Sequence, residues 1–258
     1  MARPLLAVGG IVLIGVGLAT ALGWGWSWGS DFTHTDTVSQ TIRSVKLEGD
    51  SGSVKIRTGS GPSTVREEVN YRWRNKPDGP FYRVEGDQLV LGACGRNCEV
   101  DFEVVVPQGV PVTGNLDSGG LDIAGVSSVD VQAGSGQARV EDVSGAVKLR
   151  LDSGAITLRN VGAVQLQSES GSISGDDVRG PVDVRSSSGS VGFTLSQSND
   201  VKVHADSGSV ELTVPGGPYR VEGNSDSGHR DIGVQTDGTA PHVLNLTTDS
   251  GSVTVRAA

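Results

Sequence analysis

Apolar and polar residues alternate in short segments along residues 111–258. Val147 and Leu149 flank Lys148, for example. A period of two with β-branched residues predicts β-strands with one buried side and one solvent-facing side. The expected inward residues are Val129, Val131, Val147, Leu149, Ile156, Leu158, Val164, Leu166, Val182, Val184, Val201, Val203, Val210, Leu212, Val253 and Val255. The expected outward residues are Lys148, Arg150, Thr157, Arg159, Gln165, Gln167, Asp183, Arg185, Lys202, Glu211 and Thr254.

A Ser-Gly dipeptide recurs through this region with a step of about 18 residues. Its serines are Ser118, Ser135, Ser153, Ser170, Ser188, Ser207, Ser227 and Ser250. A second glycine lies about halfway along several repeats, at Gly125, Gly145, Gly162 and Gly180. Glycine at each corner supplies the positive φ that a sharp bend needs. Each repeat therefore contains two short strands.

Two short strands cannot bury their apolar side unless repeats stack on one another. The sequence thus predicts an all-β parallel β-solenoid over residues 111–258, with about 18 residues and two strands in each rung. Glycine accounts for 38 of the 258 residues and aromatic residues for only 4%. We therefore expect a thin interior filled by valine, leucine and isoleucine.

Residues 41–110 differ from the array. The segment 47–56 resembles one rung, and longer strands are expected at 64–73, 81–85, 88–92 and 99–106. These strands are expected to form an N-terminal β cap, because an open last rung would pair with other strand edges. Residues 31–40 are expected to be a linker. The other end has no such segment after the strand at 252–256, so it is either blunted by its own loops or used for pairing.

Residues 1–30 contain the clearest targeting signal. Residues 5–23 carry no charge, which is close to the length needed to cross a bilayer as one transmembrane helix. Trp24, Trp26 and Trp28 resemble an interfacial aromatic belt, and Arg3 precedes the segment. We predict a single-pass anchor with a cytoplasmic N-terminus and the domain outside. The alternative is secretion after cleavage of a signal peptide near Ala19.

Cys94 and Cys98 are the only cysteines. An exported domain lies where disulfides persist, so we predict that these two residues form a local disulfide. A metal or redox role is the weaker interpretation, because the four histidines show no paired metal-ligand spacing. No metal or cofactor site is predicted.

The formal net charge of −9 argues against nucleic acid as a partner, since neutralising phosphates requires clustered lysine and arginine. Catalytic motifs such as a nucleophile elbow or a phosphate-binding loop are absent from the sequence. His204 with Asp206 is the one titratable pair that merits inspection. The enzyme alternative is a polysaccharide-active parallel β-helix, but no catalytic residue is predicted.

Acidic residues precede several of the Ser-Gly dipeptides. Stacked rungs would place Asp206, Asp226 and Asp249 in one column. Each aspartate either caps its own turn or shares a Ca²⁺ ion with its neighbours. The capping interpretation is favoured, because the characteristic calcium-binding repeat is absent.

The run of residues 100–110, followed by repeated Ser-Gly-x-Val-x-Val units, resembles the putative-adhesin family of bacterial envelope proteins, a domain of unknown function. The resemblance covers about residues 40–258. It implies an extracytoplasmic β-solenoid, often attached to a membrane segment, with surface or envelope-stress roles and no catalytic residues to carry over. We therefore expect a non-catalytic module for adhesion, scaffolding or envelope sensing, with an envelope protein or the cell wall as partner. The sequence does not indicate the oligomeric state.

Overall fold

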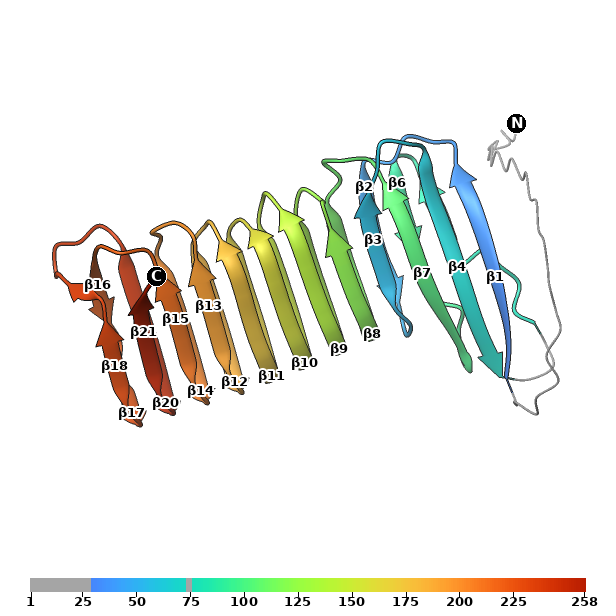
Figure 1. Ribbon diagram of the computed structural model, residues 1–258. Helices are drawn as coiled ribbons and strands as arrows, with labels where there is room; N and C mark the ends of the chain where they lie inside the picture. Colours follow the sequence, from blue (N-terminus) through green and yellow to red (C-terminus); the bar gives the residue numbers. More distant parts are fainter. Residues whose placement is uncertain (1–28, 73–75) are drawn as a thin grey trace, which may run out of the picture.

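The computed structural model describes residues 29–72 and 76–258, so the predicted membrane segment, residues 5–23, lies outside the described residues. Within the described ranges, no helix has the length and apolar character needed to cross a bilayer. These residues form 21 strands, almost all in one long and largely parallel sheet (Figure 1). The strands are β1 (Gly29–Val38), β2 (Ser44–Gly49), β3 (Val54–Thr58), β4 (Ser63–Arg72), β5 (Tyr82–Glu85), β6 (Gln88–Leu91), β7 (Cys98–Val106), β8 (Val112–Ala124), β9 (Val129–Val143), β10 (Val147–Val161), β11 (Val164–Val178), β12 (Val182–Ser188), β13 (Val191–Leu195), β14 (Val201–Ser207), β15 (Val210–Val214), β16 (Pro218–Glu222), β17 (Ser225–Ser227), β18 (Arg230–Gly233), β19 (Gln235–Thr236), β20 (Val243–Ser250) and β21 (Val253–Ala257).

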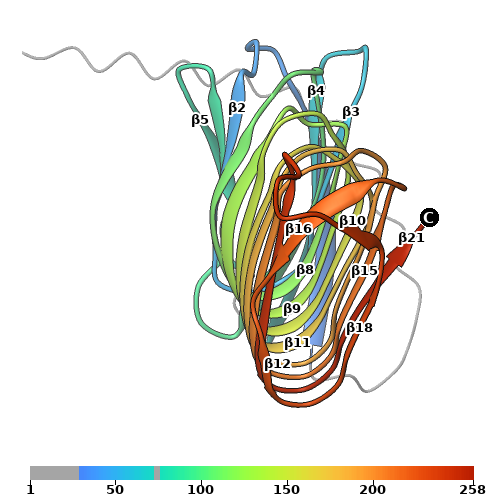
Figure 2. The ribbon, with the colours of Figure 1, turned by 90° about the vertical axis from the view of Figure 1, so that its left-hand side faces the viewer.

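The sheet coils, so that each rung has two halves that face each other (Figure 2). We call the first halves of the rungs the first wall and the second halves the second wall. The first wall contains β2, β6, β12, β14, β16 and β20, and the second contains β1, β3, β4, β7, β13, β15, β18 and β21, while β8 to β11 run through both. The prediction of two strands per rung therefore holds for the later rungs. In β8 to β11 one strand continues through the corner, because pairing with the next rung is not interrupted there.

The Ser-Gly repeat sets the register of the rungs. Ser153 pairs with Ser135 on one side and with Ser170 on the other, and the same residues of the repeat pair along the coil. All of the predicted inward residues are buried, with no more than 5% of the side chain exposed in any of them. The predicted outward residues are all exposed or half-buried. The predicted alternation is thus confirmed along the whole array.

A column of glycines lies at the Ser-Gly corner. Gly171 has a φ of 131°, and a Cβ atom placed on it would lie 1.7 Å from the carbonyl oxygen of Gly154 in the preceding rung. The same contact, at 1.7 to 1.9 Å, recurs at Gly119, Gly136, Gly154, Gly189, Gly208, Gly228 and Gly251. Only glycine fits, because any side chain would occupy the position of the neighbouring backbone.

At the second corner of each rung, near Gly125 and Gly145, glycine was predicted to supply the positive φ, and this holds for only part of the array. Gly125 has a φ of 80°, but in the next rungs the positive φ belongs to Asp142, Asn160 and Asp177. Asparagine and aspartate tolerate this conformation better than other residues with side chains. Gly145 is needed for close approach instead, since its Cβ would lie 2.5 Å from a backbone carbonyl oxygen of the preceding rung.

At the N-terminal end the rungs do not follow chain order. β2 and β3 pair in parallel with β8 on one side and with β6 and β7 on the other. The rung of residues 44–58 therefore lies between those of residues 88–106 and 112–124, and Figure 1 shows β3 between β7 and β8. Beyond β7, β4 and then β1 extend the second wall with antiparallel pairing, while β5 extends the first wall.

Residues 31–40, expected as a linker, lie mostly in β1, so that expectation is wrong. Phe32, His34, Asp36 and Val38 are at least half-buried, whereas the threonines between them are exposed. This alternation has the period of a strand, although only two of its inward residues are apolar. The polar inward residues concealed the pattern in the sequence.

The C-terminal end is also out of chain order. β20 and β21 pair with β14 and β15 on one side and with β16, β17 and β18 on the other. The strand expected at 252–256 is therefore not the end of the coil, because the rung of residues 218–233 lies outside it (Figure 1). That outer rung consists of short, mostly exposed strands, which leaves little regular edge for pairing. The end is therefore formed by a rung of short strands and not by loops alone.

The glycine column makes a testable prediction about stability. Replacing Gly171 by Ala should cost about 3 kcal/mol, because the methyl group would overlap the Gly154 carbonyl oxygen and the φ is unfavourable for alanine. Thermal unfolding should then show a melting temperature lower by roughly 6 to 12 °C. Gly192→Ala is the control, since no atom lies within 4 Å of its Cβ position. Equal melting of the two variants would contradict the role of the column.

Candidate interaction surface

His204 and Asp206 form an isolated pair on the outside of the first wall. His204 Nε2 lies 3.3 Å from Asp206 Oδ1, and the two side chains are 46% and 51% exposed. Across residues 29–72 and 76–258, no three His, Cys, Asp or Glu side chains come together as a metal site would need. The two residues are therefore an exposed contact within β14, next to the corner at Ser207 and Gly208.

The predicted aspartate column exists, but its order is different. Ser207 pairs with Ser250, and Ser250 pairs with Ser227. The preceding aspartates therefore follow one another as Asp206, Asp249 and Asp226, rather than in the predicted chain order. Asn224 donates a hydrogen bond to Asp226, and His204 contacts Asp206, so neighbours within the same rung relieve part of the charge.

Cys94 and Cys98 are joined in the structure, with an Sγ–Sγ distance of 2.02 Å and a Cα–Cα distance of 5.7 Å. Cys98 begins β7, and the sulfur bridge closes the turn just before that strand. Gly95 and Asn97 within the turn both have positive φ. Both cysteines pack against the hydrophobic core, so the bridge fixes this turn to the N-terminal cap.

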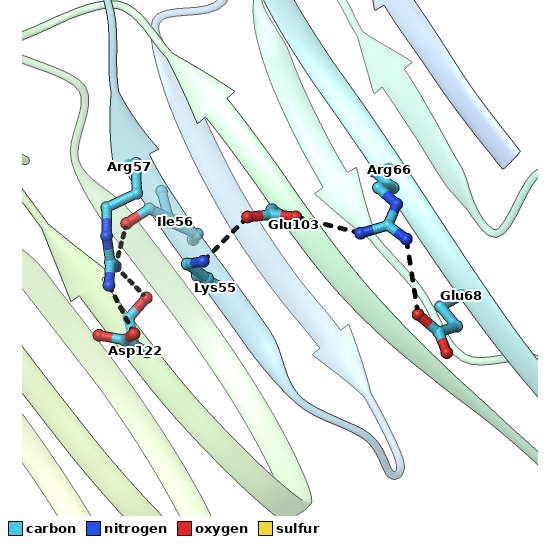
Figure 3. A network of polar contacts seen from close by, with 7 residues as sticks. All are labelled: Lys55, Ile56, Arg57, Arg66, Glu68, Glu103 and Asp122. Carbon is cyan, nitrogen blue, oxygen red and sulfur yellow. Dashed lines mark hydrogen bonds and ion pairs between the residues drawn. The ribbon is translucent and has the colours of Figure 1, made fainter. Parts of the chain in front are cut away.

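A row of alternating charges crosses the outside of the second wall at its N-terminal part (Figure 3). The row passes from Arg66 on β4 to Glu103 on β7, Lys55 on β3 and Asp122 on β8. Lys55 Nζ lies 2.9 Å from Glu103 Oε1, and Arg66 Nη1 lies 3.4 Å from Glu103 Oε2. The hydrogen bond from Lys55 lowers the pKa of Glu103 below its ordinary value. Arg66, Glu103 and Lys55 contact one another, whereas Asp122 pairs with Arg57. Since the first three are about half exposed, each of their pairs stabilises the fold by about 1 kcal/mol or less.

The same row becomes small and neutral further along the second wall. It continues through Thr157, Ser174 and Gly192 before it reaches Glu211. Gly192 lies mid-strand, and nothing lies within 4 Å of its Cβ position. The result is a shallow hollow of 460 Å³. Its lining is Arg139, Glu141, Thr157, Leu158, Arg159, Ser174, Gly175, Asp176, Gly192, Phe193, Thr194, Glu211 and Thr213.

The hollow thus has a floor of small side chains and a rim of both charges. Arg139, Arg159, Glu141, Asp176 and Glu211 supply the charges. On the corner side of the hollow, Ser172, Ser190, Ser209 and Ser252 occupy equivalent positions in successive rungs. This part of the wall therefore offers hydroxyl groups at the regular spacing of the rungs, about 4.8 Å.

A buried acidic group lies in the N-terminal cap. Glu67 on β4 is 1% exposed, its Oε1 accepts a hydrogen bond of 2.8 Å from the Phe81 amide, and its Oε2 has no partner. It faces His34 on β1, whose Nε2 lies 2.8 Å from Asp36 Oδ2, and Tyr82 also donates to that oxygen. Burial raises the pKa of Glu67, and burial together with the hydrogen bond to Asp36 raises the pKa of Tyr82.

The fold and its surfaces define an all-β repeat protein with a long, largely parallel coiled sheet and a shallow surface hollow. The chain belongs to the family described as Toastrack DUF4097, whose model matches residues 95–256. No curated protein matches the chain.

The chain is also similar to several solved structures. A putative cell adhesion protein from Clostridium sporogenes is 11% identical, with 89% of this chain and 100% of that chain covered and a TM-score of 0.29. A putative adhesin from Bacteroides fragilis is 12% identical, with 89% and 97% covered and a TM-score of 0.26. A putative adhesin from Parabacteroides merdae is 12% identical, with 88% and 96% covered and a TM-score of 0.31.

Sequence reasoning missed both the hollow and the buried glutamate. Gly192 carried a signal, because it occupies an outward position between Val191 and Phe193 where the pattern expects a polar side chain. Glu67 also carried a signal, because it stands between Val65 and Val69 at an inward position of the strand expected at 64–73, but its hydrogen-bond partner Phe81 is distant in the sequence.

The buried glutamate predicts a specific pH dependence of stability. The pKa of Glu67 is raised above 4.5 in the folded state. The contribution of Glu67 to the free energy of unfolding is therefore most favourable below pH 4.5 and is lost as the pH rises through the folded pKa. Glu67→Gln removes that loss. The melting temperature of the variant, relative to the wild type, should therefore be higher at pH 7.5 than at pH about 4.5. Glu68→Gln, at the exposed neighbouring position, should not reproduce this trend.

Proposed function

We propose that the chain is a non-catalytic module attached to the membrane outside the cytoplasm, where it holds an envelope partner against the second wall. The partner is a protein or the cell wall, and the role is adhesion or scaffolding. Support for attachment comes from the uncharged segment 5–23 and the tryptophans that follow it, directly before β1 begins at Gly29. Support for export comes from the bridged cysteines.

The hollow around Gly192 is the observation on which the binding role depends. Elsewhere on the second wall, long charged side chains contact one another, as Lys55 and Arg66 do with Glu103. At the hollow, Ser174 and Gly192 leave the backbone accessible, and a glycine within a strand often marks a place where another molecule approaches closely. Backbone groups, hydroxyls and charges of both signs are then available to one ligand.

The binding role is tested by filling the hollow. Gly192→Gln places a neutral side chain over its floor, whereas Gly238→Gln adds the same side chain at an open position in a C-terminal loop. Chemical crosslinking in intact cells, followed by pull-down of each full-length variant, measures partner recovery. Recovery should fall about tenfold for Gly192→Gln, a loss of about 1.4 kcal/mol, and stay unchanged for the control. Equal recovery by both variants would remove the hollow from the proposal.

Location is tested separately by the cysteines. Cell fractionation should recover the full chain with the membranes. Cys94 and Cys98 should be blocked from alkylation until a reductant is added, because disulfides persist outside the cytoplasm. Free thiols in protein taken directly from cells would contradict export. Protein recovered only in the soluble external fraction would instead support the cleaved form.

A further inference from the structure

The strand edges at the two ends of the coil differ in length and regularity. β1 has 10 residues, whereas β5 has 4, β16 has 5, β17 has 3 and β18 has 4. Among the described residues β1 pairs only with β4, so no described strand pairs with its other edge. Unpaired edges of this kind readily accept another strand.

Proteins usually protect such edges with proline, charged side chains, inward-pointing charges, bulges or short strands. The C-terminal end of the coil has these features, because Pro218 starts β16 and the outer strands there are short. β1 has neither proline nor lysine, and its pairing with β4 is regular from Gly29 to Val38. Its charges are Asp31 and the inward-facing Asp36, so a partner strand must place a hydrogen-bond donor opposite Asp36. Threonine, phenylalanine and valine in β1 also favour strand structure. Its exposed edge is therefore suited to pairing.

We propose that β1 pairs with β1 of a second copy of the chain, antiparallel and centred on Thr35. In this register Thr35 faces Thr35 of the second copy, and Thr33 faces Thr37. His34 faces Asp36 of the second copy, so the two side chains can hydrogen-bond across the twofold axis and form an ion pair when the histidine is protonated. Phe32 faces Val38, which joins the apolar residues at the two ends of the pair. Such cross-strand pairs of opposite charge or of aromatic and β-branched residues stabilise antiparallel sheets.

Neighbouring registers lack this complementarity. Centring the pair on Asp36 places two carboxylates directly opposite each other, and centring it on His34 places Phe32 opposite Asp36. Sliding one strand by a single residue, so that Thr35 faces Asp36, places the half-buried face of one strand against the exposed face of the other. Among the registers that keep the exposed threonines on one face and the half-buried residues on the other, the one centred on Thr35 places His34 opposite Asp36. The sequence of β1 therefore selects both the partner and the register.

The face of β1 that would continue across the axis is already ordered in one copy. His34 and Asp36 contact each other at 2.8 Å, and Tyr82 donates to the same Asp36 oxygen. Phe32 packs edge to face against Tyr71 at a centroid distance of 6.1 Å, with Lys76 Nζ 4.0 Å from its ring centre. Pairing requires little rearrangement of these side chains, so the second walls of the two copies would form one continuous sheet.

Disulfide trapping in the full-length chain, purified in detergent, tests the register. Opposed residues lie about 4.5 to 5.5 Å apart between Cα atoms, within reach of a disulfide. Thr35→Cys should therefore form a covalent dimer on mild oxidation. Thr37→Cys should not, because its two copies are four residues out of alignment, about 13 Å. A mixture of Thr33→Cys and Thr37→Cys chains should form the mixed dimer.

A charge exchange tests the interface without added cysteine. Thr35→Lys should convert the dimer to a monomer in sedimentation measurements, because like charges then meet on the axis. Mixing Thr35→Lys with Thr35→Glu chains should restore it. Thr113→Lys, at an exposed position of β8 outside the hollow, should leave the dimer intact. A monomeric wild-type chain, or equal trapping at positions 35 and 37, would overturn the proposal.

Discussion

Close backbone stacking at the Ser-Gly corner is the constraint on which the structure depends. Each glycine in the column leaves its Cβ position to the carbonyl oxygen of the preceding rung, as Gly171 does for Gly154. Strand pairing consequently continues around the bend in β10 and β11 instead of ending there. A fixed corner also fixes which residues point inward, because successive side chains alternate from it. The thin valine and leucine interior and the solvent-facing rows both follow from that corner.

The surface chemistry follows from the same regularity. Since each outward position repeats from rung to rung, side chains form rows, and the character of a row changes only where the repeat changes. Arg66, Glu103 and Lys55 neutralise one another in the N-terminal part of one row. Where Ser174 and Gly192 replace long side chains, the same row becomes a hollow. The difference between a closed and an open surface is therefore a few side chains on an unchanged backbone.

The sequence predicted the local structure of the array well, because the period of two and the Ser-Gly spacing are local properties. Val184 and Ile156 were placed inward from that pattern, and both are buried. It predicted the order of the end rungs poorly, since rungs of similar sequence offer similar edges and the choice between them depends on long-range packing. β1 was missed because His34 and Asp36 occupy inward positions in a polar cap, where tertiary contacts outweigh the apolar pattern. The burial of Glu67 has the same origin.

The displaced rung at the C-terminal end has a consequence for synthesis. Residues 218–233 emerge from the ribosome before residues 243–257, yet their final neighbours β20 and β21 belong to the later segment. The outer rung cannot reach its native position until that later segment has been made, because it pairs with β20 and β21 and not with β14 and β15. An ordinary coil could grow rung by rung as its chain appears. Here the rung of residues 243–257 lies between β14–β15 and the outer rung, so the last two rungs cannot be added in chain order.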